Sequence, residues 1–300
     1  MNDLSATTGW QPVTRRERLL TMGADVSGDG LEIGAANNPI IHSPLCRYAD
    51  YADTETLRAR FRESQYHGTD SIVDVDYVWA GSGPLRPIVG EQRFDYVIAS
   101  HVIEHVPNPL GWFRGIAAVI RPGGVFNLAI PDQRFTFDLA CPSSSLGELI
   151  EADLLGYSRP SPRQIFDNCY YGKAVDPGEP WVRAMDLALT PAYSSNATQL
   201  AYDQAAESLD GKYFDSHCWA FTPKSLLLLL RGICDLGLFD YLLADYHPTI
   251  EGEFEFFLNL EKPSLDTPSN ELRELQIQRI DFLLDVIAER DRKLQLLMEH

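Results

Sequence analysis

The stretch from Phe94 to Asp132 most constrains the fold, because it contains the signals of a strand, a loop, a helix, a turn and a second strand in unbroken order. Tyr96 to Ala99 is a short apolar run without helical period, which is typical of a buried parallel strand. From Trp112 to Ile120 the apolar residues recur at three- and four-residue spacing, which predicts a helix with one apolar face. Pro122-Gly123-Gly124 ends this helix, and Val125 to Ile130 resumes as a strand. The order predicts an α/β fold with a parallel sheet.

Two segments follow these strands and fall at the same edge of the predicted sheet. Ser100 to His105 comes after the first strand, and Pro131-Asp132 comes after the second. In open α/β sheets, ligands bind outside the carboxyl ends of the strands. This edge is therefore the expected site.

Earlier residues extend the same pattern. Gly30 to Ile33 is a short apolar strand that runs into the small residues of Gly34 to Pro39, where the backbone can approach a ligand. A second strand ends at Asp50, which lies close to the spacing of about 20 residues between a glycine loop and a ribose-binding acid in dinucleotide folds. Ser71 to Asp74 is predicted to be a third strand that also ends in an acid.

Five motifs in fixed order resemble those of class I S-adenosylmethionine-dependent methyltransferases: LEIGAANNP, RYADYAD, SIVDVD, FDYVIASHVIEHV and IRPGGVFNLAIPD. The resemblance implies a Rossmann-like seven-stranded sheet, completed by an antiparallel hairpin of Phe239 to Tyr246 and Glu253 to Leu260. The segments PDQRFTFD and His217 to Pro223 further resemble a bacterial subgroup associated with glycosyltransferases and polysaccharide biosynthesis.

The resemblance also implies which residues bind S-adenosylmethionine. Glu32 and Gly34, Ala35 and Ala36 would hold the methionine end, Asp50 the ribose, and Asp74 the adenine, while Ser100 and His101 would close over the cofactor; Ile33, Val75 and His105 complete the expected set. The loop keeps a single glycine, and only about ten residues separate it from the second strand, too few for a crossover helix. We therefore expect a clipped first helix and a more open cofactor pocket.

A metal site is the alternative interpretation of His101, Glu104 and His105. Two histidines with a glutamate between them bind zinc when they share a helix face, as in HExxH. The sequence here is HVIEH, and the methyltransferase resemblance explains it better. The sequence analysis therefore predicts no metal.

Composition restricts the partners and the compartment. The formal net charge of −18 disfavours nucleic acid and anionic membrane surfaces. Five scattered cysteines without a CxxC pair favour neither a disulfide framework nor structural zinc. Residues Met1 to Trp10 have no signal-peptide pattern, and no run approaches 18 apolar residues, so a cytoplasmic location is expected.

Three parts are predicted along the chain. Residues 1–132 and 221–262 form the cofactor-binding domain, and 133–220 form a mainly helical insertion or substrate lid, because so long a connection usually carries function. Helices are expected at Leu146 to Leu155, at Ala201 to Leu209, and from Thr222-Pro223 to Gly237. Six tyrosines of the insertion are suited equally to stacking on sugars and to packing: Tyr157, Tyr170, Tyr171, Tyr193, Tyr202 and Tyr213.

Residues 269–300 form the third part, an amphipathic helix. A heptad-like stripe comprises Ile280, Leu283, Ile287, Leu294 and Leu297. The stripe favours a coiled coil with a second copy or with a glycosyltransferase partner. A helix docked on its own domain is the alternative, and the end at His300 leaves open a longer fused enzyme.

Methyl transfer to a hydroxyl needs a group that removes its proton. His217 is the first candidate, oriented by Asp132, and His101 is the second, since a neutral imidazole is a suitable base near neutral pH. The leading hypothesis is O-methylation of a sugar or glycan intermediate, and the sugar part follows from the subgroup resemblance alone. The alternatives are another small acceptor or a catalytically weak scaffold; a nicotinamide dehydrogenase would need GxGxxG, which the loop does not supply.

Overall fold

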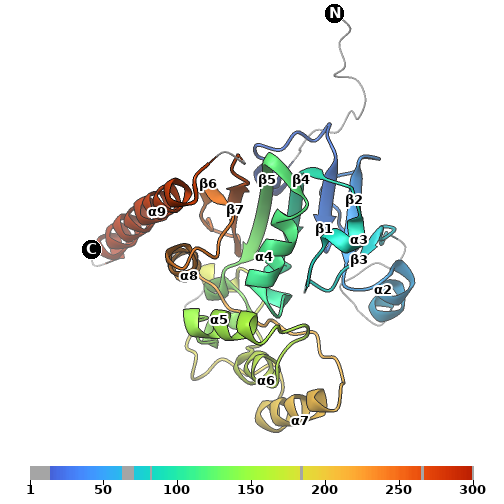
Figure 1. The fold of residues 1–300 in the computed structure, drawn as a ribbon. Coiled ribbons are helices and arrows are strands. Elements are labelled where there is room, and N and C mark those ends of the chain that lie inside the picture. Colours follow the sequence, from blue (N-terminus) through green and yellow to red (C-terminus); the bar gives the residue numbers. More distant parts are fainter. Residues whose placement is uncertain (1–13, 63–70, 82, 183–184, 265–266, 299–300) are drawn as a thin grey trace, which may run out of the picture.

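A computed structural model describes residues 14–62, 71–81, 83–182, 185–264 and 267–298, and its centre is a seven-stranded sheet (Figure 1). The strands are β1 (Gly30–Ile33), β2 (Cys46–Asp50), β3 (Tyr77–Val78), β4 (Phe94–Ser100), β5 (Ile120–Pro131), β6 (Leu242–His247) and β7 (Glu255–Glu261). Their order across the sheet is β3-β2-β1-β4-β5-β7-β6, with β7 antiparallel to both of its neighbours and the other pairs parallel. This order confirms the predicted Rossmann-like, seven-stranded fold.

Helices cover the sheet and extend beyond one end of it (Figure 1). The α-helices are α1 (Arg15–Leu20), α2 (Thr54–Phe61), α3 (Arg86–Val89), α4 (Pro109–Ala117), α5 (Leu146–Leu154), α6 (Pro162–Tyr171), α7 (Ala197–Leu209), α8 (Pro223–Asp235) and α9 (Ser269–Met298). Four short 3₁₀ turns are η1 (Ile103–His105), η2 (Gln133–Phe135), η3 (Phe137–Ala140) and η4 (Glu179–Trp181). Among the described helices, none combines the length and the apolar character that a membrane span requires.

The central strand β4 shows why both faces of the sheet must be covered. Val97 and Ala99 point into the main core with α4 and α8, whereas Tyr96 and Ile98 belong to a second cluster with Leu20 of α1. A strand with apolar side chains on both faces buries all of them only when other elements pack on each side of the sheet. The continuous apolar run therefore became a central strand, as predicted.

The connection from β1 to β2 contains no helix, which confirms the clipped first crossover. The carboxylate of Glu32, in β1, instead accepts hydrogen bonds from the backbone N–H groups of Ile40 and Ile41. Both isoleucines are buried in the second cluster, on the face where α1 packs. The loop thus takes the place of a helix on that face, with the carboxylate of Glu32 satisfying its backbone donors.

Two predicted boundaries are wrong. Ser71 to Asp74 is not a strand, and β3 is formed by Tyr77 and Val78 instead. The backbone N–H of Asp76 donates to the carbonyl oxygen of Tyr48, and the chain pairs with β2 only from that point. Residues 122–124 do not separate helix from strand, since α4 already ends at Ala117 and β5 begins at Ile120. Gly123, with φ of +77°, lies within this irregular start of β5.

The segment predicted to be an insertion is helical, with α5 and α7 at the expected places and α6 in addition. Each of α5, α6 and α8 begins with a capping box in which a serine or threonine and the residue three positions later bond each other's backbone N–H. For α8 the pair is Thr222 and Ser225, with Pro223 at the first turn, as expected. Figure 1 shows α5, α6 and α7 gathered beyond the lower end of the sheet.

The long helix α9 docks on its own domain. Ile280 and Ile287 are buried in the main core, and Leu283 packs against it. Gln276 donates to the carbonyl oxygens of Phe239 and Tyr241, which precede β6. The stripe that predicted self-association is thus largely covered within the chain, whereas the side chains of Leu294 and Leu297 lie outside the described residues.

Candidate active site

A cavity of about 580 Å³ opens at the carboxyl ends of β1, β2 and β4. Most of the residues predicted to bind the cofactor line it: Glu32, Ile33, Gly34, Ala35, Ala36, Asp50, Ser100, His101 and His105. This is the sheet edge that the motifs predicted, and the volume lies within the range of small-molecule sites.

The floor of the cavity comprises Glu32 and the loop that follows β1. Burial raises the pKa of Glu32 to about 7, although its hydrogen bonds from Ile40 and Ile41 and the charge of Arg16 oppose the rise. Its carboxylate holds the loop in place, because it accepts the two backbone donors at 2.8 to 3.1 Å. The loop therefore approaches the cavity with its backbone.

Gly34 and Ala36 both adopt the left-handed backbone region in this loop, with φ of +72° and +46°. A Cβ atom at Gly34 would lie 2.6 Å from Cγ2 of Val102, so a side chain does not fit there. The single glycine is thus placed where both the backbone angle and the close approach of the next loop require it.

Asp50 ends β2, is buried, and completes the floor of the same cavity. Burial raises its pKa to about 6, with the N–H of Tyr51, which donates to Oδ1 at 2.8 Å, acting in the opposite direction. A buried carboxylate is stabilised when hydroxyl groups donate hydrogen bonds to it, because each bond replaces one that the carboxylate made to water. Asp50 is therefore well placed for a ligand's hydroxyl groups.

Asp74 and Val75 do not reach this cavity. Asp74 is 95% exposed and lies 3.6 Å from Arg58, and neither residue is part of the described cavity wall. Because the predicted strand at Ser71 to Asp74 does not form, the acid at its end is not carried to the sheet edge. Trp79 and Ala80, which follow β3, line the cavity instead.

His101 follows β4 directly and has a positive φ of 54°. Its Nε2 atom lies 2.8 Å from Glu255, and its Nδ1 atom lies 3.7 Å from Glu104. Glu255 also pairs with Arg16, which in turn contacts Ser100. Burial raises the pKa of Glu255, but His101 and Arg16 outweigh it and lower the pKa below its usual value.

His105 and His217 meet on the side of the cavity that faces the helical segment. Their rings lie edge to face with centroids 4.6 Å apart. Nδ1 of His105 lies 3.0 Å from Asp215, and Nδ1 of His217 lies 2.7 Å from Asp138. Burial lowers the pKa of His105, but the hydrogen bond and charge of Asp215 outweigh it and raise the value to about 9.

Asp132 does not orient His217, contrary to the sequence prediction. Its fully buried carboxylate accepts hydrogen bonds from Arg134 and from the hydroxyl of Thr249. The residue that pairs with His217 is Asp138, six positions further on. His217 itself is not part of the described cavity wall, whereas His105 and Asp215 are.

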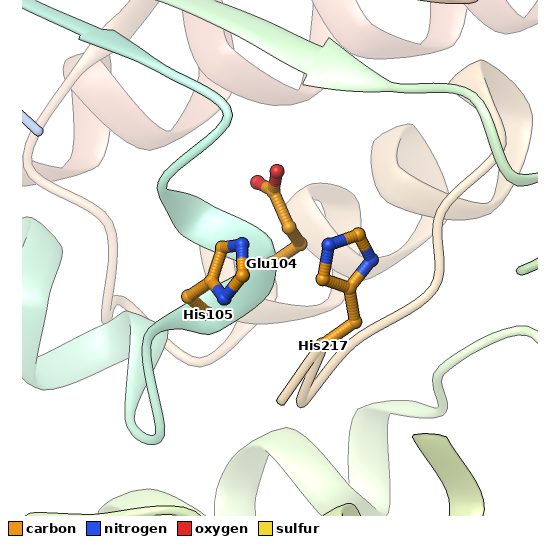
Figure 2. A group of neighbouring side chains, drawn as sticks. All are labelled: Glu104, His105 and His217. Carbon is orange, nitrogen blue, oxygen red and sulfur yellow. The ribbon is translucent and has the colours of Figure 1, made fainter. Parts of the chain in front are cut away.

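Glu104 completes this group, which we call the histidine wall: Glu104, His105 and His217 with their partners Asp138 and Asp215. Figure 2 shows the Glu104 side chain with the two imidazole rings on either side of it. One ligand atom from each of Glu104, His105 and His217 lies within 4.8 Å of the others. The metal site weighed and rejected from the sequence comprised His101, Glu104 and His105. In the structure, His217 takes the place of His101 in this group.

Backbone contacts bring His217 to this place across more than 100 residues. The N–H groups of Cys218 and Trp219 donate to the carbonyl oxygen of Glu104, and the indole N–H of Trp219 donates to that of Val106. The backbone N–H of His217 donates to Asn168 of α6. The helical segment and the loop after β4 are thus joined at the cavity.

Sequence reasoning missed several residues of the site. Asp138 had a signal, because it ends the PDQRFTFD segment, and Asp215 lies two residues before His217. Tyr213 was among the six tyrosines considered for sugar stacking, whereas Tyr51 and Arg60 had no signal. The rings of Tyr51 and Tyr213 stack with centroids 6.3 Å apart, and the guanidinium of Arg60 lies over both. All three line the cavity.

Comparison with known proteins identifies the family. Residues 13–232 match the family described as "Methyltransferase domain". The chain belongs to this family.

Curated relatives match about a third of this chain. The chain is 31% identical over 97 residues to a ubiquinone biosynthesis O-methyltransferase of Methylobacterium nodulans, which covers 32% of this chain and 38% of the relative. It is 28% identical over 96 residues to the protein of the same name from Bordetella pertussis, covering 31% and 39%. The chain thus matches less than half the length of these relatives.

Solved structures resemble the fold more distantly. The CcbJ methyltransferase from Streptomyces caelestis is 14% identical, with a TM-score of 0.41, over 85% of this chain and 97% of that one. A likeness at this level carries no argument about activity. The assignment to the family therefore rests on the sequence match and on the sheet order.

A methyltransferase domain of this class implies S-adenosylmethionine, and the residues present fit it. The buried Asp50 lines the cavity and would accept hydrogen bonds from the ribose hydroxyls. The loop at Gly34 lies so close to Val102 that no Cβ atom fits there, and its backbone would lie against the cofactor. Glu32, buried beneath the loop, would hold that loop in place at the methionine end. When bound, the cofactor supplies an electrophilic methyl group, and the protein's part is to orient the acceptor and accept its proton.

Proposed function

We propose that this chain is an S-adenosylmethionine-dependent methyltransferase that acts on a hydroxyl of a small polar acceptor. The observation that carries the proposal is the cavity itself. Its floor has the small-residue loop and the acid expected for the cofactor, and its other side has imidazoles beside carboxylates. Family membership supports methyl transfer, and the relatives named O-methyltransferases support oxygen as the acceptor atom.

His101 is the proposed proton acceptor. It lines the cavity directly after β4, whereas His217, the first candidate from the sequence, does not. Glu255 holds its Nε2 atom at 2.8 Å, and Glu104 lies on the other side of the ring, so negative charge surrounds an imidazole that takes up a proton. A positioned general base contributes about 10²- to 10⁴-fold to a rate.

A sugar or glycan intermediate is the proposed acceptor, with another small metabolite as the alternative. Within the described residues, Tyr213 is the one tyrosine of the predicted insertion that lines the cavity, and its stack with Tyr51 under Arg60 offers a flat surface for a ring. The other five pack or are exposed elsewhere, so they give no support to sugar stacking. The neighbouring carboxylates favour a neutral acceptor over an anionic one.

The first test is calorimetric titration of the purified chain with S-adenosylmethionine, its demethylated product and NAD. Micromolar binding of the first two that is lost in Asp50→Ala, with no binding of NAD, is expected. An acceptor screen then begins with neutral sugars and nucleotide sugars. Absence of binding by either methionine-derived ligand would favour the scaffold alternative.

The second test compares His101→Gln with His247→Gln. His247 is also paired with a carboxylate, Asp245 at 3.4 Å, but does not line the cavity. We expect His101→Gln to lower turnover at saturating cofactor at least about 100-fold. Equal turnover in the two variants would contradict the role given to His101.

A further inference from the structure

We propose that Glu104, His105 and His217 bind a first-row transition-metal dication such as zinc. The three residues come from the loop after β4 and from the segment before α8, and they offer two imidazoles and one carboxylate within 4.8 Å of one another. Two histidines and a glutamate form a set used by catalytic zinc sites, which keep a further position open. The proposal does not depend on the methyltransferase activity.

The carboxylate of Glu104 is the observation that points to a ligand. Its side chain is 1% exposed, and neither of its oxygens has a hydrogen-bond partner. Nδ1 of His101 lies 3.7 Å from its Oε1, which is too long for a hydrogen bond. Burying a carboxylate without such bonds is costly, and a bound cation is one of the ways by which proteins offset this cost.

Both imidazoles are held as metal-binding histidines usually are. Asp215 lies 3.0 Å from Nδ1 of His105, and Asp138 lies 2.7 Å from Nδ1 of His217. A histidine whose Nδ1–H is donated to a carboxylate has its ring orientation fixed, and it offers the lone pair of Nε2 to a metal that displaces any proton there. This arrangement occurs twice in one cluster, at both of the proposed nitrogen ligands.

The ligand types select among cations. Imidazole nitrogen suits zinc, iron, cobalt and nickel, whereas magnesium and calcium prefer all-oxygen sites. Of the three ligands, His105 lines the cavity, whereas Glu104 and His217 do not. The proposed cation would therefore lie beside the cavity, next to His105.

The experiment is titration of the chelator-treated full chain with Zn²⁺ by competition against a chromophoric chelator. One equivalent per chain is expected, and we expect His217→Gln to weaken binding at least about 100-fold. His247→Gln is the matched control, expected to bind like the wild type. Asp138→Asn and Asp215→Asn, which keep the ligands but change their support, are expected to weaken binding about 10- to 100-fold. Equal affinity in wild type and His217→Gln, or no saturable binding of Zn²⁺, overturns the proposal.

Thermal unfolding of Glu104→Gln keeps the test informative if a histidine variant does not fold. Without metal this variant should be at least as stable as the wild type, because it removes a buried charge that lacks hydrogen bonds. With saturating Zn²⁺ only the wild type should gain stability, since a cation that binds the folded state stabilises it. A Glu104→Gln variant that gains as much as the wild type contradicts the site, and Mg²⁺ should stabilise neither.

Discussion

The floor of the cavity and the histidine wall would bind their proposed ligands in different ways. The floor, made by Glu32, Gly34 and Asp50, lies within one stretch of chain and works through backbone approach and buried carboxylates. The histidine wall joins the loop after β4 to residues 138–217 and works through side-chain pairs. The two regions share few side chains, so we expect cofactor binding and metal binding to be separable by mutation.

The largest expected effect divides these two regions. Asp50→Ala should weaken S-adenosylmethionine binding at least about 100-fold, because two charge-assisted hydrogen bonds of about 1.5–3 kcal/mol each are lost. The same variant should bind Zn²⁺ like the wild type. Calorimetry with each ligand measures both affinities. A parallel loss of the two would contradict the independence of the floor and the histidine wall.

The next effect concerns Glu32 and pH. Its pKa is raised from 4.5 to about 7, mainly by burial, so between these values the folded protein holds a proton that the unfolded chain has lost. The contribution of Glu32 to the free energy of unfolding therefore falls as pH rises through this window and is constant above it.

Glu32→Gln removes this dependence. Its stability relative to the wild type should increase by about 3 kcal/mol between pH 4.5 and pH 8, from the shift in pKa at about 1.36 kcal/mol per unit. Urea unfolding of both proteins across this range measures the difference. A difference that does not vary with pH would show that burial does not raise the pKa of Glu32.

A smaller effect tests the close approach at the floor. Gly34→Ala places a Cβ atom 2.6 Å from Val102 at a φ of +72°, and the backbone strain alone costs about 1–2 kcal/mol. We expect cofactor affinity to fall about tenfold. Val102→Ala in the same chain should recover part of it, because it removes the clash and leaves the strain. No recovery would mean that the clash does not contribute.

The smallest effect concerns Arg60, whose guanidinium lies 5.1 Å and 5.4 Å from the ring centroids of Tyr51 and Tyr213. Arg60→Lys keeps the charge but loses the planar group, which should cost about 0.5–1 kcal/mol. The Michaelis constant for an acceptor found in the screen should rise a few-fold, with turnover and Zn²⁺ affinity unchanged. A change in Zn²⁺ affinity instead would show that Arg60 influences the histidine wall.

The sequence predicted the floor better than the histidine wall for a physical reason. Strand, loop and acid follow one another along the chain, so their periodicity and spacing contain the geometry, and Glu32, Gly34 and Asp50 all line the cavity. Asp74 was misplaced because two apolar β-branched residues, Ile72 and Val73, before an acid resemble the end of a strand, whereas pairing with β2 begins only at Tyr77. The segment PDQRFTFD contains both Asp132 and Asp138, and nothing in its spacing selects Asp138 as the partner of His217.

The sequence by itself determined the order of strands, the missing first crossover helix and the loops at one sheet edge, because parallel strands bring their carboxyl ends together. Only the tertiary structure decided that His217 lies beside Glu104 and that the stripe of α9 packs on its own domain. An apolar stripe is equally suited to a second copy and to the chain's own core. Contacts between residues 104 and 217 depend on how the intervening helices fold back, which no local period encodes.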